Sequence, residues 1–381
     1  MTAPRDPYFL NLQAALQAAG AVGPILVIDK ARLNANIDAV VNHLPAGMDL
    51  RVVAKSLPSR DLLSHILARA GTNRFMTFNL PMLLGVSEAF PDASQLLGKP
   101  LVAAAAKAYY DRLPVSARAA AEHVTWLVDT PDRLAQYAAI AEAAGVQMAV
   151  CVEVDVGLNR GGFHPGDAFR GALETIRASN RLTLAGMMGY DAHLTARLND
   201  QVALDRGLAD VQSAYAAALA DIDAVFGEGA AAGLLRNTGG SPTFHLHTDI
   251  SLANEICVGS ALVMPSGFDT PGLAAHQPAA FIAAPVLKTV SIPSASGAEP
   301  GVYIHGGRWM ADVVDPPGLT PHRGARSSNQ ELIMGACDLA PDDFLFLRPR
   351  QSEAVFLQFG DIAVYDTKEI TDWWPVFPAS A

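Results

Sequence analysis

The feature that most constrains this chain is a repeated alternation of short apolar runs with longer amphipathic stretches. The apolar runs lie at 52–55, 74–78, 101–106, 124–128, 148–154, 182–189, 233–240 and 256–263. Each is apolar on both faces, which is typical of parallel strands buried on both sides. Eight strands alternating with helices predict an α/β fold built on a parallel (β/α)8 barrel of TIM type. An open, doubly wound sheet is the structural alternative.

The stretches between the runs carry helix signals. The clearest begins at Thr130-Pro131 and ends at Gly145. Its apolar side chains, Leu134, Tyr137, Ala138 and Ala141, share one face. Proline in the first turn and glycine after the last turn are typical helix boundaries. We therefore expect a helix between these positions.

The chain is expected to divide into three parts. Its 381 residues suit a barrel of roughly 250 residues and a second domain of roughly 100. The apolar run at 24–30 precedes the eight and is expected to pair with the second domain. After about residue 270, Gly and Pro clusters separate apolar runs that have no helix between them. The prediction is an N-terminal segment (1–23), a barrel (24–270) and a β-rich C-terminal domain (271–381).

The composition narrows the classes of partner and compartment. The chain has 27 Lys and Arg against 38 Asp and Glu, a net charge of −11, which argues against nucleic acid and anionic membranes as partners. No apolar stretch approaches the roughly 20 residues of a membrane span. The three cysteines, Cys151, Cys257 and Cys337, are far apart and odd in number. Reduced, buried thiols in a cytoplasmic protein are expected.

Lysines at strand ends are the first candidates for chemistry, because active sites of such barrels form where strands end. Of the six lysines, Lys55 and Lys107 are the two predicted to end strands. A lysine amine taken out of water loses proton affinity and can form a Schiff base. Position alone does not separate the two. A lysine whose amine reaches solvent is the structural alternative.

Two further strand-end clusters carry charged or titratable groups. The segment 153–162 ends in glycines and contains Arg160, which can hold a fixed anion. The segment 186–193 contains Tyr190 and His193, which can orient a substrate or move protons. A capping turn with a structural salt bridge and an ordinary loop histidine are the alternatives.

Two glycine-rich segments follow late strands, where such barrels commonly bind phosphate. They contain Gly239, Gly240, Ser241 and Thr243 in the first, and Gly259 and Ser260 in the second. Glycines let backbone N–H groups approach an oxyanion, and hydroxyl groups add donors. A phosphate site is therefore expected, with an ordinary turn as the alternative. His245 and His247 resemble a metal pair but are expected to be loop or strand histidines, and Glu255 is expected to be structural.

These clusters, in this order, resemble the pyridoxal 5′-phosphate-dependent barrel family of alanine racemase and D-threonine aldolase. VVAKS at 52–56 is similar to the place of that family's cofactor lysine, which favours Lys55 over Lys107. DVGLNRGG at 155–162 resembles a D-T-G-x-N-R-x-G run, which implies that Arg160 contacts the cofactor's phenolic oxygen. GGSPT at 239–243 resembles the phosphate-binding G-G-[ST]-P-T run. The resemblance extends from about 24 to 270, and Tyr190 is counted among the cofactor contacts.

The second domain is more similar to the D-threonine aldolase and D-serine dehydratase branch than to alanine racemase. HGGRWMA at 305–311 and NQEL at 329–332 resemble that branch's D-A-G-x-x-A and N-Q-E-H runs, and the racemase's catalytic-tyrosine motif is not found. The branch's metal-binding P-x-H-x-[CD] run corresponds here to 349–353, with Gln351 in the histidine's place. Glutamine is a poor metal ligand, so the sequence leaves a divalent metal undecided. Gln351 and Glu353 are expected to contact the substrate.

The resemblance implies an enzyme that uses pyridoxal 5′-phosphate on Lys55 to act on a small D-amino acid. The leading hypothesis is retro-aldol cleavage of D-β-hydroxy amino acids to glycine and an aldehyde, with His193 and Glu353 as candidate proton acceptors. A dehydratase (deaminase) or a racemase with the same cofactor comes next. A non-catalytic cofactor-binding protein is an alternative of another class, and a barrel with unrelated chemistry is the plainest one. The resemblance also implies a homodimer.

Overall fold

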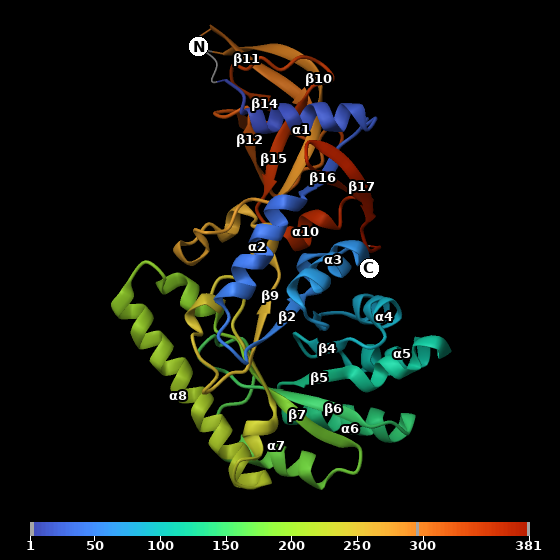
Figure 1. The fold of residues 1–381 in the computed structure, drawn as a ribbon, viewed down its shortest axis with the longest axis vertical. Helices are drawn as coiled ribbons and strands as arrows, with labels where there is room; N and C mark the ends of the chain where they lie inside the picture. Colours follow the sequence, from blue (N-terminus) through green and yellow to red (C-terminus); the bar gives the residue numbers. More distant parts are fainter. Residues whose placement is uncertain (1–3, 295–296, 379–381) are drawn as a thin grey trace.

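Eight parallel strands close into a barrel in the computed structural model, which describes residues 4–294 and 297–378 (Figure 1). The strands are β2 (Asp49–Val53), β3 (Arg74–Thr77), β4 (Ser94–Leu97), β5 (Val124–Val128), β6 (Met148–Glu153), β7 (Leu182–Gly189), β8 (Leu235–Thr238) and β9 (Glu255–Val258). Each pairs with its neighbours in sequence, and β9 closes the barrel against β2. The predicted fold class is therefore confirmed.

Helices follow the barrel strands and cover the outside of the barrel (Figure 1). They are α3 (Arg60–Ala70), α4 (Leu80–Ala89), α5 (Ala103–Arg112), α6 (Pro131–Ala144), α7 (Asp167–Ala178), α8 (Gln201–Phe226) and the short α9 (Ser260–Val263), and α2 (Lys30–His43) precedes the barrel. The predicted helix bounded by Thr130 and Gly145 is confirmed as α6. The Thr130 side chain caps its first turn, and Gly145 follows the last turn in the left-handed conformation with φ of 67°.

The third predicted strand was wrong. Residues 101–106 lead into α5, and the strand at this place is β4, whose sequence is SQLL. The polar Gln95 is fully buried, and its side-chain N–H donates to Ser87 Oγ at 2.9 Å. A strand whose polar residue is hydrogen-bonded from inside does not look apolar in the sequence.

This correction also removes Lys107 as a candidate for chemistry. Lys107 lies on α5, is exposed, and forms an ion pair with Asp111 one turn away, at 2.6 Å. Lys99, another of the six lysines, follows the end of β4 and is exposed.

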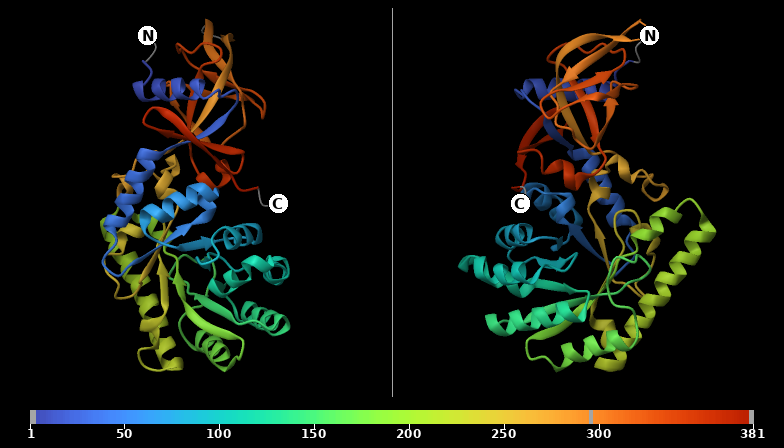
Figure 2. Two further views of the ribbon diagram at one scale, coloured as in Figure 1. Left: turned by 45° about the vertical axis from the view of Figure 1, so that its right-hand side comes forward. Right: turned by 180° about the vertical axis from the view of Figure 1, so that it is seen from behind.

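A nine-stranded sheet forms the second lobe of the molecule (Figure 2). Its strands are β1 (Ile25–Asp29), β10 (Ala280–Ser294), β11 (Gly297–Ile304), β12 (Ala311–Asp315), β13 (Thr320–Arg326), β14 (Glu331–Met334), β15 (Phe344–Pro349), β16 (Asp361–Asp366) and β17 (Glu369–Pro375). As expected for the run at 24–30, β1 pairs with this domain, antiparallel to β10 and parallel to β16. The helix α1 (Pro7–Ala18) packs on the sheet through Phe9, Leu12 and Leu16.

The C-terminal domain was expected to have no helices, and this was wrong at one place. A five-residue helix, α10 (Ser352–Phe356), lies between β15 and β16. It is too short to leave a helical period in the sequence. Its position matters because it faces the end of β2, which is the mouth of the barrel.

The two lobes share one apolar core. A single cluster of buried side chains joins Leu62 and Ile66 of α3 to Leu347 and Ile362 of the sheet. The chain's last strand also returns to the barrel, because the Phe377 N–H donates to the Pro58 carbonyl at 2.7 Å. The lobes are therefore packed against each other over an apolar surface, which favours a fixed relative position.

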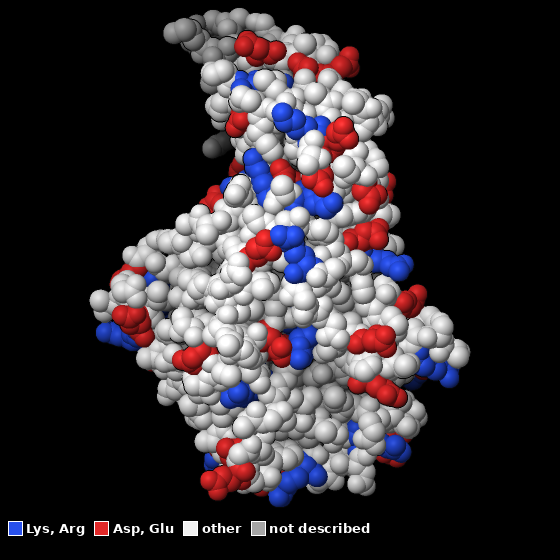
Figure 3. Space-filling model, viewed as in Figure 1, with Lys and Arg blue, Asp and Glu red and all other residues white. Residues whose placement is uncertain are grey.

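Charged side chains are spread over the surface without an extended basic patch on the face that Figure 3 shows. Basic and acidic groups alternate there with uncharged areas. Across the described ranges, 4–294 and 297–378, no helix has the length and apolar character needed to span a bilayer.

Candidate active site

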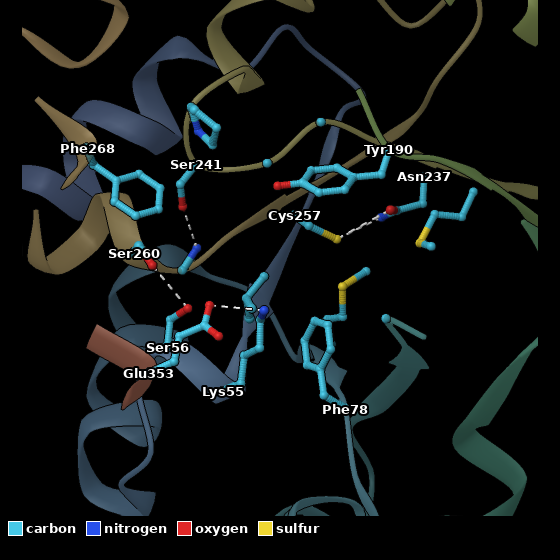
Figure 4. A pocket seen from close by; sticks show the side chains of 18 of the residues that line it. Lys55, Ser56, Phe78, Tyr190, Asn237, Ser241, Cys257, Ser260, Phe268 and Glu353 are labelled. Atoms are coloured by element: carbon cyan, nitrogen blue, oxygen red, sulfur yellow. Dashed lines mark hydrogen bonds and ion pairs between the residues drawn. The ribbon is translucent and has the colours of Figure 1, made fainter. Parts of the chain in front are cut away.

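A pocket lies where the barrel strands end, facing the second domain (Figure 4). Nine of the predicted site residues line it: Lys55, Arg160, Tyr190, Gly239, Gly240, Ser241, Gly259, Ser260 and Glu353. The rest of the lining comes from Val53, Ser56, Met76, Phe78, Gly98, Met188, Asn237, Pro242, Cys257 and Phe268. The pocket therefore combines one amine, one guanidinium, one carboxylate and several hydroxyl groups with an apolar wall.

Lys55 projects into this pocket from the turn that follows β2. Its amine lies 3.0 Å from Oε1 of Glu353 and 4.5 Å from the centre of the Phe78 ring. About a third of the lysine side chain is exposed. The amine is thus held between a carboxylate and an aromatic face.

Glu353 reaches Lys55 from α10, so the ion pair crosses the boundary between the domains (Figure 4). The neighbouring Ser352 is fully buried, and its hydroxyl lies 3.2 Å from that of Ser260, which donates in turn to Ser56. This row of three hydroxyl groups fastens α10 to the barrel mouth. The second domain therefore contributes a functional group to the barrel's own site.

Gly259 lets the ends of β9 and β2 approach each other closely. A β-carbon at this position would lie 2.8 Å from the β-carbon of Val53. Its N–H donates to Ser241 Oγ at 3.1 Å, and the N–H of Ala261 donates to the same oxygen at 3.0 Å. Ser241 therefore joins the two glycine-rich segments, and the Gly259 N–H already has an acceptor within the protein.

The glycine pair 239–240 shapes the opposite wall. Gly239 has φ of 64°, a conformation that favours glycine. A β-carbon at Gly240 would lie 2.7 Å from the Tyr190 ring. The absence of a side chain at this position lets the loop backbone pack closely against the tyrosine ring in the pocket wall.

Arg160 extends from the loop after β6, over the Tyr190 ring, with its guanidinium carbon 5.0 Å from the ring centre. It also lies 3.5 Å from Oε1 of Glu153, and half of its side chain is exposed. Burial raises the pKa of Glu153, although Arg160 opposes this shift. Burial, reinforced by Asp191, raises the pKa of Tyr190 to about 12, so its hydroxyl is a neutral donor at physiological pH.

A buried polar network continues below the pocket floor. Glu255 pairs with Arg51, as expected for a structural residue, and also accepts from the Asn237 side chain at 2.8 Å. The same Asn237 amide donates to Cys257 Sγ at 3.0 Å. Burial raises the pKa of Cys257 to about 12, so the thiol stays neutral.

Three predicted site residues lie outside the pocket. His193 packs beside Gly157, where a β-carbon would be 3.1 Å from its Nε2. Thr243 is buried and donates to Asp191 at 2.6 Å. Gln351 is exposed at the start of α10. Sequence reasoning found the right segments here but not the directions of the side chains.

Sequence reasoning also missed pocket residues. Phe78 follows β3 directly, and Cys257 lies two residues before Gly259 on β9, so both follow from strand-end position and from the alternation of faces. Phe268 belongs to the linker between the domains and carried no signal. Among the described residues, no group of three or more His, Cys, Asp or Glu side chains is placed to hold a metal ion.

The donors of the pocket fit pyridoxal 5′-phosphate. An amine can take the aldehyde, and the guanidinium of Arg160 can hold an anionic oxygen. The hydroxyl groups of Ser241 and Ser260, beside the glycine pair, can receive a phosphate. A β-carbon at Gly240 would meet the Tyr190 ring, so a glycine at this position keeps the loop and the tyrosine together in the pocket wall.

Comparisons of the sequence with known proteins identify a family and one relative. The family model of the alanine racemase N-terminal domain matches residues 28–267. A 3-hydroxy-D-aspartate aldolase from Paracoccus denitrificans (strain Pd 1222) is 26% identical over 148 residues, which are 38% of this chain. The match spans about a third (36%) of that relative's length.

Solved structures share the whole two-lobed fold. D-threonine aldolase from Filomicrobium marinum has a TM-score of 0.77 at 17% identity, over 93% of this chain and 97% of its own. D-threo-3-hydroxyaspartate dehydratase from Delftia sp. HT23 has a TM-score of 0.75 at 16% identity, over 94% and 98%. An alanine racemase from Clostridium difficile 630 has a TM-score of 0.72 at 12% identity, over 93% and 98%. At these identities the likeness is one of fold.

Proposed function

The chain belongs to the family of the alanine racemase N-terminal domain, which is pyridoxal 5′-phosphate-dependent, and from this premise we propose that it is a lyase that cleaves D-β-hydroxy amino acids to glycine and an aldehyde. The names of the similar proteins, a D-threonine aldolase and a 3-hydroxy-D-aspartate aldolase, support this substrate class. The observation that carries the proposal is the contact between Lys55 and Glu353 across the domain boundary.

Lys55 would hold the cofactor through its amine. Arg160 would hold the phenolic oxygen, and the segment 239–241 with Ser260 would receive the phosphate. When bound, the cofactor supplies an electron sink that weakens bonds at the substrate's α-carbon. The protein's own contribution is to orient the substrate and to move its protons.

Glu353 would accept the proton of the substrate's β-hydroxyl group. Its carboxylate lies 3.0 Å from the Lys55 amine, which is within reach of a substrate bound beside that amine. The carboxylate is partly exposed at the pocket mouth, so a substrate hydroxyl can approach it. His193, the other candidate, lies outside the pocket, and we assign the proton transfer to Glu353 alone.

The raised pKa values of two pocket residues favour the lyase over a two-base racemase. Besides Lys55 and Glu353, the lining residues that could exchange a proton are Tyr190 and Cys257. Burial raises the pKa of each to about 12, so neither exchanges protons readily near neutral pH. The carboxylate supplied by the second domain also argues against a protein that only binds the cofactor. A homodimer stays a prediction, which light scattering can test.

The test is product analysis after incubation of the pure protein with D-threonine, with EDTA or with added Mn²⁺. Glycine and acetaldehyde are the expected products. Products that vanish with EDTA would mean that a metal assists the cleavage, and products unaffected by EDTA would mean that Glu353 suffices. Ammonia and a keto acid would instead identify a dehydratase.

The role of Glu353 is tested by Glu353→Gln, which keeps the shape of the side chain but cannot accept the proton. We expect kcat to fall by about a hundredfold or more, as for loss of a general base. Glu142→Gln is the matched control, because Glu142 pairs with Arg181 on the surface of the barrel. Unchanged turnover of Glu353→Gln would remove Glu353 from the mechanism.

A further inference from the structure

A buried carboxylate lies behind the glycine-rich loop, and the cofactor contacts proposed above do not account for it. Asp191 is fully buried and follows Tyr190 in the chain. It accepts one hydrogen bond from Thr243 Oγ1 at 2.6 Å and another from His247 Nε2 at 2.7 Å. A buried carboxylate is costly unless hydrogen bonds and charge compensate it, so the arrangement calls for a reason.

Thr243 connects this carboxylate to the loop. Its one hydroxyl proton is donated to Asp191, so its oxygen is free to accept the N–H of Gly240 at 3.2 Å. The Gly240 carbonyl accepts in return from the N–H of Thr243 at 2.9 Å and of Phe244 at 2.8 Å. The Gly240 peptide is therefore fixed from behind on both of its polar groups.

His247 contacts the loop from the other side of the carboxylate. A β-carbon at Gly239 would lie 3.3 Å from Cδ2 of the His247 ring. The same ring donates to Asp191, so one side chain contacts both the first glycine of the loop and the buried carboxylate.

We propose that Asp191 and His247 are positioning residues, which act through Thr243 and hold the segment 239–241 in the shape that receives the cofactor's phosphate. The inference rests on the proposed function, since it presumes a cofactor at Lys55. Neither residue lines the pocket. Their effect therefore passes through the loop and should fall on the phosphate group, while the aldehyde end near Lys55 is unaffected.

The test compares two ligands that differ in the phosphate alone. Apoprotein is titrated with pyridoxal 5′-phosphate and with pyridoxal, and binding is followed by absorbance. Asp191→Asn should weaken pyridoxal 5′-phosphate by about tenfold or more, the effect of a lost charge-assisted hydrogen bond, and change pyridoxal affinity by less than about twofold. Asparagine has the same shape but cannot accept from both donors.

Two variants of Thr243 keep the test informative if Asp191→Asn does not fold. Thr243→Val removes the hydroxyl and should reproduce the selective loss. Thr243→Ser keeps the hydroxyl and should restore the wild-type ratio of the two affinities. If Thr243 acted on stability alone, the ratio of the two affinities would not depend on whether residue 243 has a hydroxyl group.

Asp221→Asn is the matched control. Asp221 is a buried carboxylate on α8 that accepts from Arg170 and from the Gly166 N–H, away from the pocket. This variant should lower the thermal stability and leave the affinity ratio unchanged. The inference would be overturned if Asp191→Asn lowered the affinities for both ligands by the same factor. It would also be overturned if Asp221→Asn changed the ratio of the two affinities as much as Asp191→Asn does. Two outcomes would refute the proposed function itself: a wild-type protein that binds neither ligand, or a Lys55→Ala variant that binds both ligands as tightly as the wild type does.

Discussion

Replacing Glu255 by glutamine should strongly destabilise the protein. Glu255 is 1% exposed, and its oxygens bind Nε and Nη2 of the fully buried Arg51 at 2.6 and 2.8 Å. A second arginine, Arg74, lies 3.5 Å from the same carboxylate. Removal of one partner from a buried pair leaves an uncompensated charge and costs about 3–5 kcal/mol.

The electrostatics of Arg51 show why the loss is large. Burial alone lowers the pKa of Arg51, but Glu255 outweighs it, and the pKa lies above the ordinary value. In Glu255→Gln the cost of burial remains and the compensation is gone. Glutamine also turns a donor group toward Arg51 or Asn237, which both donate to this carboxylate.

The assay is urea-induced unfolding followed by circular dichroism. The free energies of unfolding are compared between variants with the same m-value, the slope of the free energy against urea concentration. The control is Asp38→Asn, which breaks the exposed pair with Arg69 and should cost at most about 1 kcal/mol. The double variant Arg51→Met with Glu255→Leu removes both charges and should lose less stability than Glu255→Gln alone. A loss in Glu255→Gln no larger than that in Asp38→Asn would refute the reasoning.

Three further outcomes are expected. Lys55→Ala should abolish the absorbance of bound cofactor, whereas Lys107→Ala should leave it unchanged, because Lys107 lies on an exposed helix. Gly240→Ala should weaken cofactor binding measured by titration, by about 1–3 kcal/mol, since its β-carbon would press on the Tyr190 ring. Denaturant unfolding should show stability falling as pH rises from about 9 to 12. The unfolded chain loses the Cys257 proton near 9.0, whereas burial keeps the thiol protonated in the fold up to about 12.

The barrel could be predicted because its strands are buried on both faces, and buried parallel strands are short apolar runs. The exception shows the limit of that signal. In β4 the buried Gln95 donates to Ser87, and the carbonyl of Ser94 accepts from Arg51. Both partners come from other elements, so no pattern within the strand itself indicates that its polar residues lie inside.

The site was predictable to the level of segments. Lys55, Arg160 and the glycines at 239–240 all follow strand ends and line one pocket, because the carboxyl ends of parallel strands meet at one edge of the barrel. Side-chain direction was not predictable. Thr243 and His193 belong to segments that reach the pocket, yet short turns after the strands point both side chains away from it.

That Lys55 and Glu353 share one site followed from the family resemblance and not from residue patterns, because their contact depends on how the lobes are docked. Glu353 lies on the five-residue α10, and the strand that follows, β16, pairs in parallel with β1. The strand β1 leads directly into α2, which packs against α3 and α9 of the barrel. The distance between amine and carboxylate therefore depends on this N-terminal strand as well as on the serine contacts that join α10 to the barrel. Changes that loosen β1 should then alter turnover before they unfold the barrel.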